Sequence, residues 1–234
     1  MEQYVFLPPP VVAVPVRGNT ALFPVRRVFC VGRNYAAHAV EMGRPVDKSS
    51  AEPFYFTKSS QAIIASGSRT PYPPGTHNFH YEMELVVAIG APAFRVSEEE
   101  APRAIFGYAC GLDMTRRDLQ LIARDQGRPW DLGKDVEQSA VISELVPATH
   151  LGVLKQGAIS LSVNGAVKQQ SDLQHLIWNI PELIAHLSRF YHLLPGDLIF
   201  TGTPEGVGPV QPGDRIEGFI EQVGTIELEI AAPE

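Results

Sequence analysis

Short apolar runs separated by turn residues dominate the chain, a pattern typical of β-strands rather than of amphipathic helices. Strand follows strand with only occasional helices between them, unlike the regular alternation of a doubly wound fold. The sequence therefore predicts an α+β protein that is mainly β, with a mixed, largely antiparallel sheet and short peripheral helices. The predicted strands are residues 28–32, 54–57, 62–65, 107–112, 198–201, 215–219 and 225–230, together with the most apolar run, within residues 80–90.

Few helices are expected, and their end signals mark them. Asn34 can cap a short helix that Gly43 and Pro45 would stop. At about two turns, this helix would be marginal unless something packs against it. Other helical patterns, each with a capping residue or a stop signal, occupy residues 97–105, 115–126 and 179–189.

The first 27 residues contain three consecutive prolines, Pro8 to Pro10, and lack helical periodicity. We expect them to form an extended arm lying on a single domain that spans residues 28–234. No apolar run approaches the roughly 20 residues of a membrane span, and the N-terminus lacks the order of a signal peptide, so no membrane association and a cytoplasmic location are expected. Cys30 and Cys110 stand in apolar contexts and are predicted to be reduced core residues.

The formal net charge of −7 and the scattered lysines and arginines argue against a nucleic-acid-binding surface. Any anionic substrate must therefore meet a locally positive pocket. The candidate cations near the acidic motifs are Arg33, Lys58, Arg117 and Lys134, although each of them taken alone can also be an ordinary surface charge.

Two glutamates, Glu82 and Glu84, stand at the start of the most apolar run. Because the side chains of a strand alternate between its faces, both would share one side with Val86 and Ala88 and point toward an interior. Carboxylates about 6–7 Å apart between Cα atoms repel each other, and partial burial adds a desolvation cost. The pair therefore needs a shared proton, a cationic side chain or a metal, and a divalent cation is the simplest partner.

Asp113 ends another apolar strand directly before a predicted helix. It can cap that helix, or it can join Glu82 and Glu84 as a third oxygen ligand. Three carboxylates without His or Cys partners suit Mg²⁺, Mn²⁺ or Ca²⁺ and disfavour zinc or copper.

His38 and Glu41 lie three residues apart on the short predicted helix, so their side chains share a face. A neutral histidine oriented by a carboxylate is a competent general base, but the same spacing also occurs in exposed helical pairs.

The segment 201–208, rich in Gly and Thr, lacks the lysine and spacing of a phosphate-binding loop. It can hold a small carboxylate or form a plain tight turn.

Five stretches follow one another in a defined order: Val31-Gly32-Arg33-Asn34-Tyr35-Ala36-Ala37-His38, His80-Tyr81-Glu82-Met83-Glu84-Leu85, Gly111-Leu112-Asp113-Met114-Thr115 with Arg117-Asp118, Lys134, and Thr201-Gly202-Thr203-Pro204. Together they resemble the fumarylacetoacetate hydrolase family, over nearly the whole chain from about Arg27. Within that family the chain is similar to the small acylpyruvate and fumarylpyruvate hydrolases.

The resemblance implies a Mg²⁺ or Mn²⁺ site, which crystals can also fill with Ca²⁺, at Glu82, Glu84 and Asp113. It implies a His38–Glu41 catalytic dyad on a lid that closes over a small anionic keto-acid substrate. It further implies a mixed β-sandwich-like roll and a homodimer. The implied substrate-binding residues are Gln120, Thr203 and Lys134, joined by the candidate cation Arg33, and Lys134 would also stabilise developing charge during catalysis.

The activity that this resemblance implies is metal-dependent hydrolysis of the carbon–carbon bond of a 3-acylpyruvate, with fumarylpyruvate converted to fumarate and pyruvate. Oxaloacetate decarboxylation, or isomerisation or decarboxylation of a hydroxymuconate-type diacid, are alternatives within the family. A metal-stabilised protein that binds small diacids without turnover is an alternative of a different class. The His38–Glu41 pair argues against such a non-catalytic protein.

Overall fold

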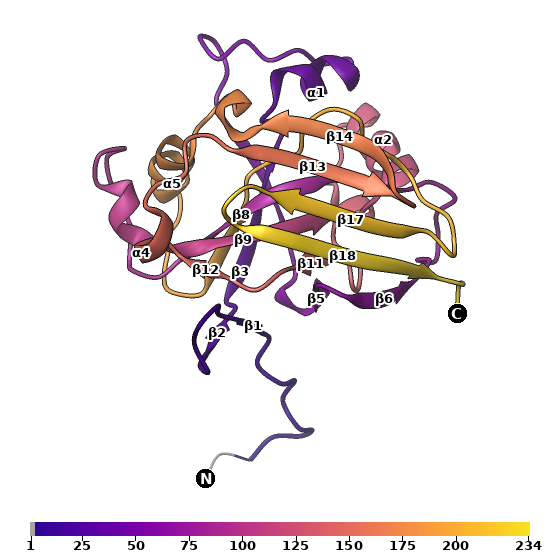
Figure 1. Ribbon diagram of the computed structural model, residues 1–234, viewed down its shortest axis with the longest axis horizontal. Coiled ribbons are helices and arrows are strands. Elements are labelled where there is room, and N and C mark those ends of the chain that lie inside the picture. The colour runs from indigo at the N-terminus through magenta and orange to yellow at the C-terminus, as the bar shows by residue number, and fades with distance from the viewer. Residues whose placement is uncertain (1–2) are drawn as a thin grey trace.

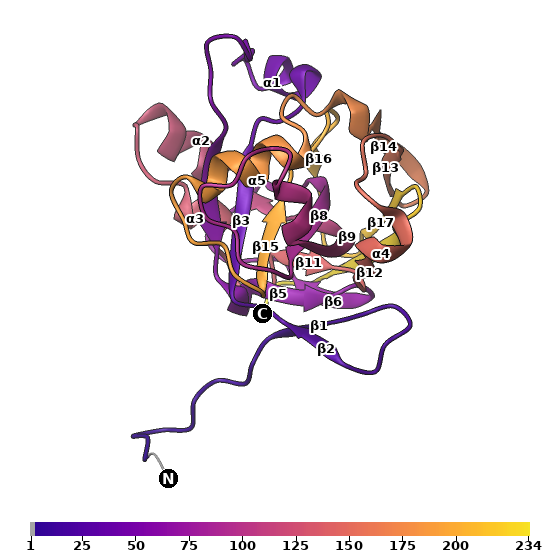
Figure 2. The ribbon, with the colours of Figure 1, turned by 90° about the vertical axis from the view of Figure 1, so that its left-hand side faces the viewer.

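The computed structural model of the protein describes residues 3–234 and contains two large β-sheets that pack face to face (Figures 1 and 2). The larger sheet has the strand order β4-β3-β15-β8-β9-β11-β5, and β12 pairs with β9 off this path. Its strands are β3 (Arg27–Gly32), β4 (Phe54–Lys58), β5 (Ile63–Ala65), β8 (Met83–Ile89), β9 (Ile105–Asp113), β11 (Ala140–Ile142), β12 (Val146–Pro147) and β15 (Asp197–Phe200).

The second large sheet has the order β14-β13-β17-β18-β6. Its strands are β6 (Ser68–Pro71), β13 (Ala158–Val163), β14 (Ala166–Asp172), β17 (Arg215–Ile220) and β18 (Gly224–Ala231). A small sheet joins β7 (Phe79–Tyr81) to β10 (Thr115–Arg116) and β16 (Gly208–Pro209). Most neighbouring strands are antiparallel, while β15–β3, β11–β5 and β18–β6 are parallel, so the predicted mixed, mainly β fold is confirmed.

The apolar run that contains β8 separates two cores, because its side chains alternate between the faces of the larger sheet. Leu85 and Val87 belong to the core between the two large sheets. Val86 and Ala88 belong to a second core on the opposite face. Both faces of this strand are therefore covered, which explains its unusually apolar sequence.

The N-terminal segment covers part of that second core. Within the predicted extended arm, β1 (Ala13–Pro15) and β2 (Leu22–Pro24) pair as an antiparallel hairpin, at the base of the molecule in Figure 2. Val14 and Phe23 are buried in the second core. The arm is thus interrupted by a short hairpin that the sequence did not reveal.

Helices lie at the periphery, as Figure 1 shows for α1, α2 and α5. They are α1 (Ala36–Glu41), α2 (Arg117–Asp125), α3 (Asp131–Lys134), α4 (Ala148–Leu151) and α5 (Ile180–Ser188), with 3-10 turns at Ser60–Ala62, Ala101–Ala104 and Leu173–His175. The predicted capping box of α5 is present, since Asn179 and Glu182 each accept from the other's backbone N–H. Across the part of the chain described here, no helix is long and apolar enough to cross a membrane.

Two expectations for the helices are wrong. The predicted helix over 97–105 is only a 3-10 turn at 101–104, because Ile105 already pairs with Ile89 as the first residue of β9. Asn34 does not cap α1. Its amide is buried and instead binds the backbone of Trp178 and Thr201, so it ties the end of β3 to two distant segments.

The hairpin of β13 and β14 was also missed. Its two-residue turn is Asn164-Gly165, with φ of 51° and 77° at these residues. This dipeptide is the strongest short-range hairpin signal, since both residues tolerate a positive φ.

Cys30 and Cys110 are buried and unpaired, in agreement with the prediction that they are reduced core residues.

Candidate metal centre and active site

Three carboxylates from two neighbouring strands converge at one end of the larger sheet. Glu84 lies in β8 and Asp113 ends β9, while Glu82 sits in the break between β7 and β8. The antiparallel register of β8 and β9 brings Asp113 beside Glu82, whose carbonyl accepts from the Asp113 N–H at 2.9 Å. One oxygen from each of the three carboxylates lies within 4.8 Å of the others, and all three residues are buried.

The position of Asp113 decides between its two predicted roles. It belongs to β9, and the residue at the N-cap of α2 is Arg116. The helix-capping alternative is therefore wrong, and the carboxylate of Asp113 is free to face the other two.

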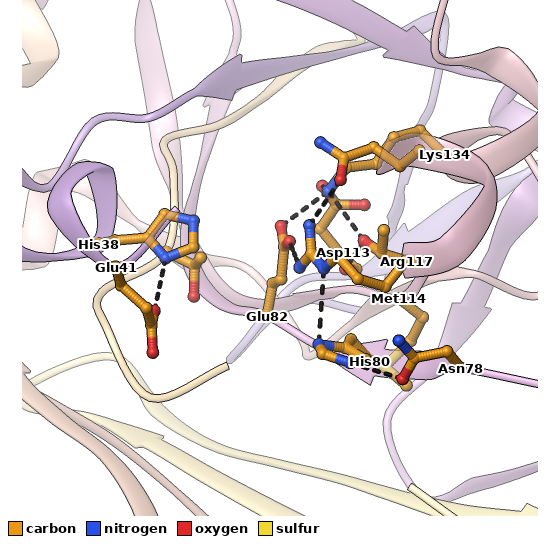
Figure 3. A network of polar contacts seen from close by, with 12 residues as sticks. His38, Glu41, Asn78, His80, Glu82, Asp113, Met114, Arg117 and Lys134 are labelled. Carbon is orange, nitrogen blue, oxygen red and sulfur yellow. Dashed lines mark hydrogen bonds and ion pairs between the residues drawn. The ribbon is translucent and has the colours of Figure 1, made fainter. Parts of the chain in front are cut away.

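Cationic side chains surround two of the carboxylates (Figure 3). Lys134 Nζ lies 2.7 Å from both Glu82 Oε2 and Asp113 Oδ2. Arg117 contacts Glu82 Oε1, and Lys58 Nζ lies 2.9 Å from Asp113 Oδ1. Burial alone would raise the pKa of Glu82, but Lys134 and Arg117 outweigh it and hold that pKa well below its usual range.

Glu84 has no cationic partner among the residues that the structure describes. Its only hydrogen bond comes from the backbone N–H of Gly202, at 2.7 Å from Oε2, within residues 3–234. Burial raises the pKa of Glu84 well above its ordinary value, and the neighbouring charges of Asp113 and Glu82 raise it further. An additional cation beside Glu84 would remove this penalty.

The donor set fits a hard divalent cation. All three candidate ligands offer carboxylate oxygens, which Mg²⁺ and Mn²⁺ prefer. Asp113 Oδ1 is buried and, in the described part of the chain, receives no hydrogen bond of good geometry despite its ion pair with Lys58. A carboxylate oxygen has two lone pairs, so the contacts of Glu82 with Lys134 and Arg117 still leave room for a metal. The cations therefore orient the carboxylates and still leave oxygen lone pairs that can bind a metal.

The predicted general-base pair faces this cluster from α1 (Figure 3). His38 is buried, with its Nδ1 3.0 Å from Glu41 Oε2, whereas Glu41 is exposed, so only one member of the pair faces solvent. Glu41 also accepts from the backbone N–H of Gly206 at 3.1 Å. The hydrogen bond with His38 is the main cause that lowers the pKa of Glu41. His38 is thereby oriented by an ionised carboxylate that is itself anchored.

The segment 201–208 supports both halves of the site. Gly202 has a φ of 101°, and a Cβ there would lie 2.7 Å from the Cβ of Asn34. Gly206 has a φ of 91°, and a Cβ there would lie 2.1 Å from the carbonyl oxygen of Lys168. Only glycine fits these two positions. Their N–H groups hold Glu84 and Glu41, so one loop positions a candidate ligand and the orienting acid.

Gln169, which sequence reasoning missed, fixes this loop to the carboxylate strand. Its buried amide donates to Thr203 Oγ1 at 2.9 Å and to the Pro204 carbonyl at 2.8 Å, and its Oε1 accepts from the N–H of Met83 at 3.0 Å. Nothing in the local sequence distinguishes Gln169 from Gln170, because its role arises only when β14 reaches the loop.

A cavity of about 250 Å³ brings the site together. Its lining includes the predicted residues Arg33, His38, Glu82, Glu84, Arg117, Gln120, Lys134 and Thr203, as well as Arg44, Arg124 and Trp130. The volume is below the roughly 300–1,000 Å³ of pockets for drug-sized ligands, which suits a small acid. Although the protein carries a net charge of −7, five Lys and Arg side chains and only two acidic ones line this cavity.

His80 and Lys58 serve the site indirectly. His80 Nδ1 lies 3.5 Å from Arg117 Nε, and its Nε2 lies 2.8 Å from Asn78 Oδ1. Burial, followed by the charge of Arg117, lowers the pKa of His80 to about 4. His80 is therefore a neutral support for Arg117. Lys58 is buried behind Asp113 and is not among the residues that line the cavity.

Comparison with known proteins agrees with this geometry. Residues 27–231 match the model of the fumarylacetoacetate hydrolase C-terminal family. A fumarylpyruvate hydrolase from Ralstonia sp. is 61% identical over 193 residues, which cover 82% of this chain and 100% of that protein. An oxaloacetate tautomerase from Escherichia coli (strain K12) is 40% identical, covering 83% of this chain and 88% of the relative.

A solved structure points the same way. The crystal structure of fumarylpyruvate hydrolase from Pseudomonas aeruginosa, in complex with Mn²⁺ and pyruvate, superimposes with a TM-score of 0.94 at 47% identity. The match covers 98% of this chain and 100% of that one. From the sequence match, the shared fold and the buried acidic cluster, we conclude that the chain belongs to the fumarylacetoacetate hydrolase family.

Proposed function

We propose that the protein hydrolyses the carbon–carbon bond of a 3-acylpyruvate, with fumarylpyruvate converted to fumarate and pyruvate. The observation that carries this proposal is that His38, oriented by Glu41, lines the same cavity as the carboxylates of Glu82 and Glu84. The 61% identity to a fumarylpyruvate hydrolase supports the choice of substrate. A neighbouring structure that holds Mn²⁺ and pyruvate supports a metal and a keto acid at this site.

Glu82, Glu84 and Asp113 would hold Mg²⁺ or Mn²⁺. When bound, the ion would supply a Lewis acid that draws electron density from the keto-acid end of the substrate. The chain's part is to hold the ligands in place before the ion arrives. Lys134 bridges Glu82 and Asp113, and the N–H of Gly202 fixes Glu84. Such support fixes the orientation of ligands around a metal.

His38 would act as the general base. Because ionised Glu41 accepts from Nδ1, the proton of the neutral imidazole resides there and Nε2 is left to accept a proton. A water oxygen forms a bond to the distal acyl carbonyl carbon as His38 takes one of its protons. The carbon–carbon bond then breaks, its electron pair passes to the pyruvate fragment, and that fragment takes up a proton to leave as pyruvate.

Polar side chains around the cavity would bind the anionic substrate. Gln120 is buried and accepts from Arg117 at 3.0 Å, so its amide group is held in a fixed orientation. Thr203 is held by Gln169, and Lys134 places its ammonium beside the carboxylates. We assign Gln120, Thr203 and Lys134 to substrate binding, with Lys134 also stabilising negative charge as it develops. Arg33 contributes a further positive charge.

A second candidate activity is the tautomerisation of oxaloacetate, because an oxaloacetate tautomerase is 40% identical to this chain. Decarboxylation of oxaloacetate, and isomerisation or decarboxylation of a hydroxymuconate-type diacid, are further candidate reactions. Hydrolysis differs from all of these in requiring an attacking water. Buried His38 can take a proton from that water, but tautomerisation and isomerisation also need a base, so the choice of substrate decides between these reactions.

A substrate panel tests the proposal. Purified protein with Mg²⁺ is assayed spectrophotometrically with fumarylpyruvate, acetylpyruvate, oxaloacetate and a hydroxymuconate. Fumarylpyruvate is expected to be cleaved fastest, with activity lost on chelation and restored by metal. Negligible cleavage of fumarylpyruvate beside rapid loss or tautomerisation of oxaloacetate would overturn the proposal. Tight binding of diacids without any product would instead indicate a non-catalytic binding protein.

The family resemblance implies a homodimer and a lid. We propose that the protein is a homodimer, that it acts in the cytoplasm, and that α1 with its His38–Glu41 pair closes over the substrate as a lid. Light scattering coupled to size-exclusion chromatography would reveal a mass of twice 25.6 kDa for the dimer. A single chain mass at micromolar concentration would contradict it.

A further inference from the structure

Three arginines stand apart from the acidic cluster on the wall of the same cavity. Arg33 follows β3, Arg44 follows α1, and Arg124 lies in the last turn of α2. Arg117 and Lys134, the other cations of the cavity, are already committed to Glu82 and Asp113 through ion pairs. The positive charge of the cavity that is not paired with the acidic cluster therefore resides on the three arginines.

Arg33 is held in a specific and costly conformation. Its φ is 53°, in the left-handed region that costs a non-glycine residue about 1–2 kcal/mol. Its guanidinium lies over the ring of Phe54, with the carbon Cζ 4.8 Å from the ring centroid. The ring fits there because its paired residue is Gly32, where a Cβ would lie 2.0 Å from the ring. The local sequence thus builds a platform beneath Arg33.

Two of the three arginines have no anion that balances them within residues 3–234. Arg33 Nε is buried and has no hydrogen-bond partner within residues 3–234, and in the same span the side chain of Arg44 forms no hydrogen bond or ion pair. Arg124 pairs with its exposed neighbour Asp125 at 2.9 Å. Burial lowers the pKa of Arg33, and the charges of Arg44 and Arg124 lower it further, so both of these arginines lie close enough to Arg33 to repel it. One exposed aspartate balances only one of them.

We propose that Arg33, Arg44 and Arg124 form a subsite for a second carboxylate, at the far end of the substrate from its keto acid. The inference rests on the proposed cleavage of 3-acylpyruvates. It restricts the substrates to 3-acylpyruvates whose acyl group carries a carboxylate. A guanidinium binds a carboxylate through two parallel hydrogen bonds, and a bound anion removes the repulsion among the three cations. A neutral acyl group such as acetyl leaves that repulsion in place.

Each arginine can be removed with little change to the backbone. Arg44→Gln and Arg124→Gln remove charge at positions of ordinary conformation. Arg33→Asn removes the guanidinium, and asparagine tolerates a positive φ better than most residues do. The matched control is Arg103→Gln, because Arg103 is an exposed arginine outside the cavity lining, near the opposite end of β9 from Asp113.

The test compares kcat/KM for fumarylpyruvate and acetylpyruvate in the presence of Mn²⁺. Loss of one charge-assisted contact is expected to lower kcat/KM for fumarylpyruvate by about ten- to a hundred-fold, mainly through KM, in each cavity variant. For acetylpyruvate the value is expected to stay within about two-fold of wild type in Arg44→Gln and Arg124→Gln, and Arg103→Gln is expected to leave both substrates unaffected. Equal losses for the two substrates, or no loss for either, would overturn the subsite while leaving the proposed hydrolysis intact.

Two further outcomes separate the subsite from the rest of the site. If wild-type protein cleaves neither substrate, the proposed function fails and the subsite fails with it. Thermal stabilisation by Mn²⁺ and oxalate, which mimics only the keto-acid end, is expected to persist in every arginine variant. Its loss would assign the arginines to the metal centre and overturn the subsite.

Discussion

Replacing Glu84 by glutamine tests whether the three carboxylates form a metal site. The substitution keeps the shape of the side chain and removes the carboxylate of the cluster that has no cationic partner among residues 3–234. Glu82 and Asp113 keep their ion pairs with Lys134, so the surrounding structure is expected to persist. Metal-free Glu84→Gln protein should be at least as stable as wild type, because the change removes a buried charge beside two others.

The expected size of the metal effect follows from linkage. Metal at one hundred times its dissociation constant stabilises the folded state by about 2.7 kcal/mol, which corresponds to a rise in Tm of about 5–11 °C for a domain of this size. If loss of the Glu84 charge weakens binding a hundred-fold, the same metal concentration contributes only about 0.4 kcal/mol, or about 1 °C. The two proteins should therefore differ clearly in a thermal-shift titration with Mn²⁺.

Glu41→Gln is the matched control for this experiment. It makes the same chemical change at a carboxylate that contacts His38 and Gly206 but not the acidic cluster. Its rise in Tm with Mn²⁺ should equal that of wild type. A Glu84→Gln protein that keeps the full Mn²⁺ shift, or a Glu41→Gln protein that loses it, would refute the division between metal ligands and general-base pair.

Three further substitutions test other parts of the site. His38→Ala should lower kcat by about 10²–10⁴-fold, the usual worth of general-base catalysis, while the Mn²⁺ thermal shift persists; a lost shift would make His38 a metal ligand. Gly206→Ala places a Cβ 2.1 Å from the carbonyl of Lys168 at a positive φ, so chemical denaturation should show a loss of about 2–5 kcal/mol, and a neutral result would disprove the close packing. Gln169→Leu leaves the buried N–H of Met83 without its acceptor and should cost about 1–3 kcal/mol in the same measurement, whereas unchanged stability would show that Gln169 does not anchor the loop.

The sequence revealed those features that are encoded locally. Alternation in residues 80–90 predicted that both faces of β8 are buried. The structure explains this, because Leu85 packs into the core on one face of the sheet and Val86 into the core on the other. The pairing of His38 with Glu41 follows from helical spacing and is present at 3.0 Å. The sequence did not predict features that depend on contact with a distant segment of the chain. Asn34 has the chemistry of a helix cap, but the backbone of Trp178 and Thr201 binds its amide instead.

The same limit applies to the candidate site. The sequence suggested that Lys134 meets the substrate, whereas its hydrogen bonds to Glu82 and Asp113 appear only when α3 packs against β4 and β10. No local sequence pattern marks Arg44 and Arg124 as site residues, because only the folded chain brings them to the wall of the same cavity. Residue type and spacing thus predict what a segment can do, and tertiary packing decides which partner it meets.

Crystals grown with Mn²⁺ and oxalate would test the central claim most directly. Anomalous diffraction locates Mn²⁺ independently of the protein coordinates. We predict a single strong peak within bonding distance of carboxylate oxygens from Glu82, Glu84 and Asp113, with oxalate on the same ion and facing His38. An ion bound elsewhere, or three carboxylates closed on Lys134, Arg117 and Lys58 with no ion among them at saturating Mn²⁺, would contradict the account.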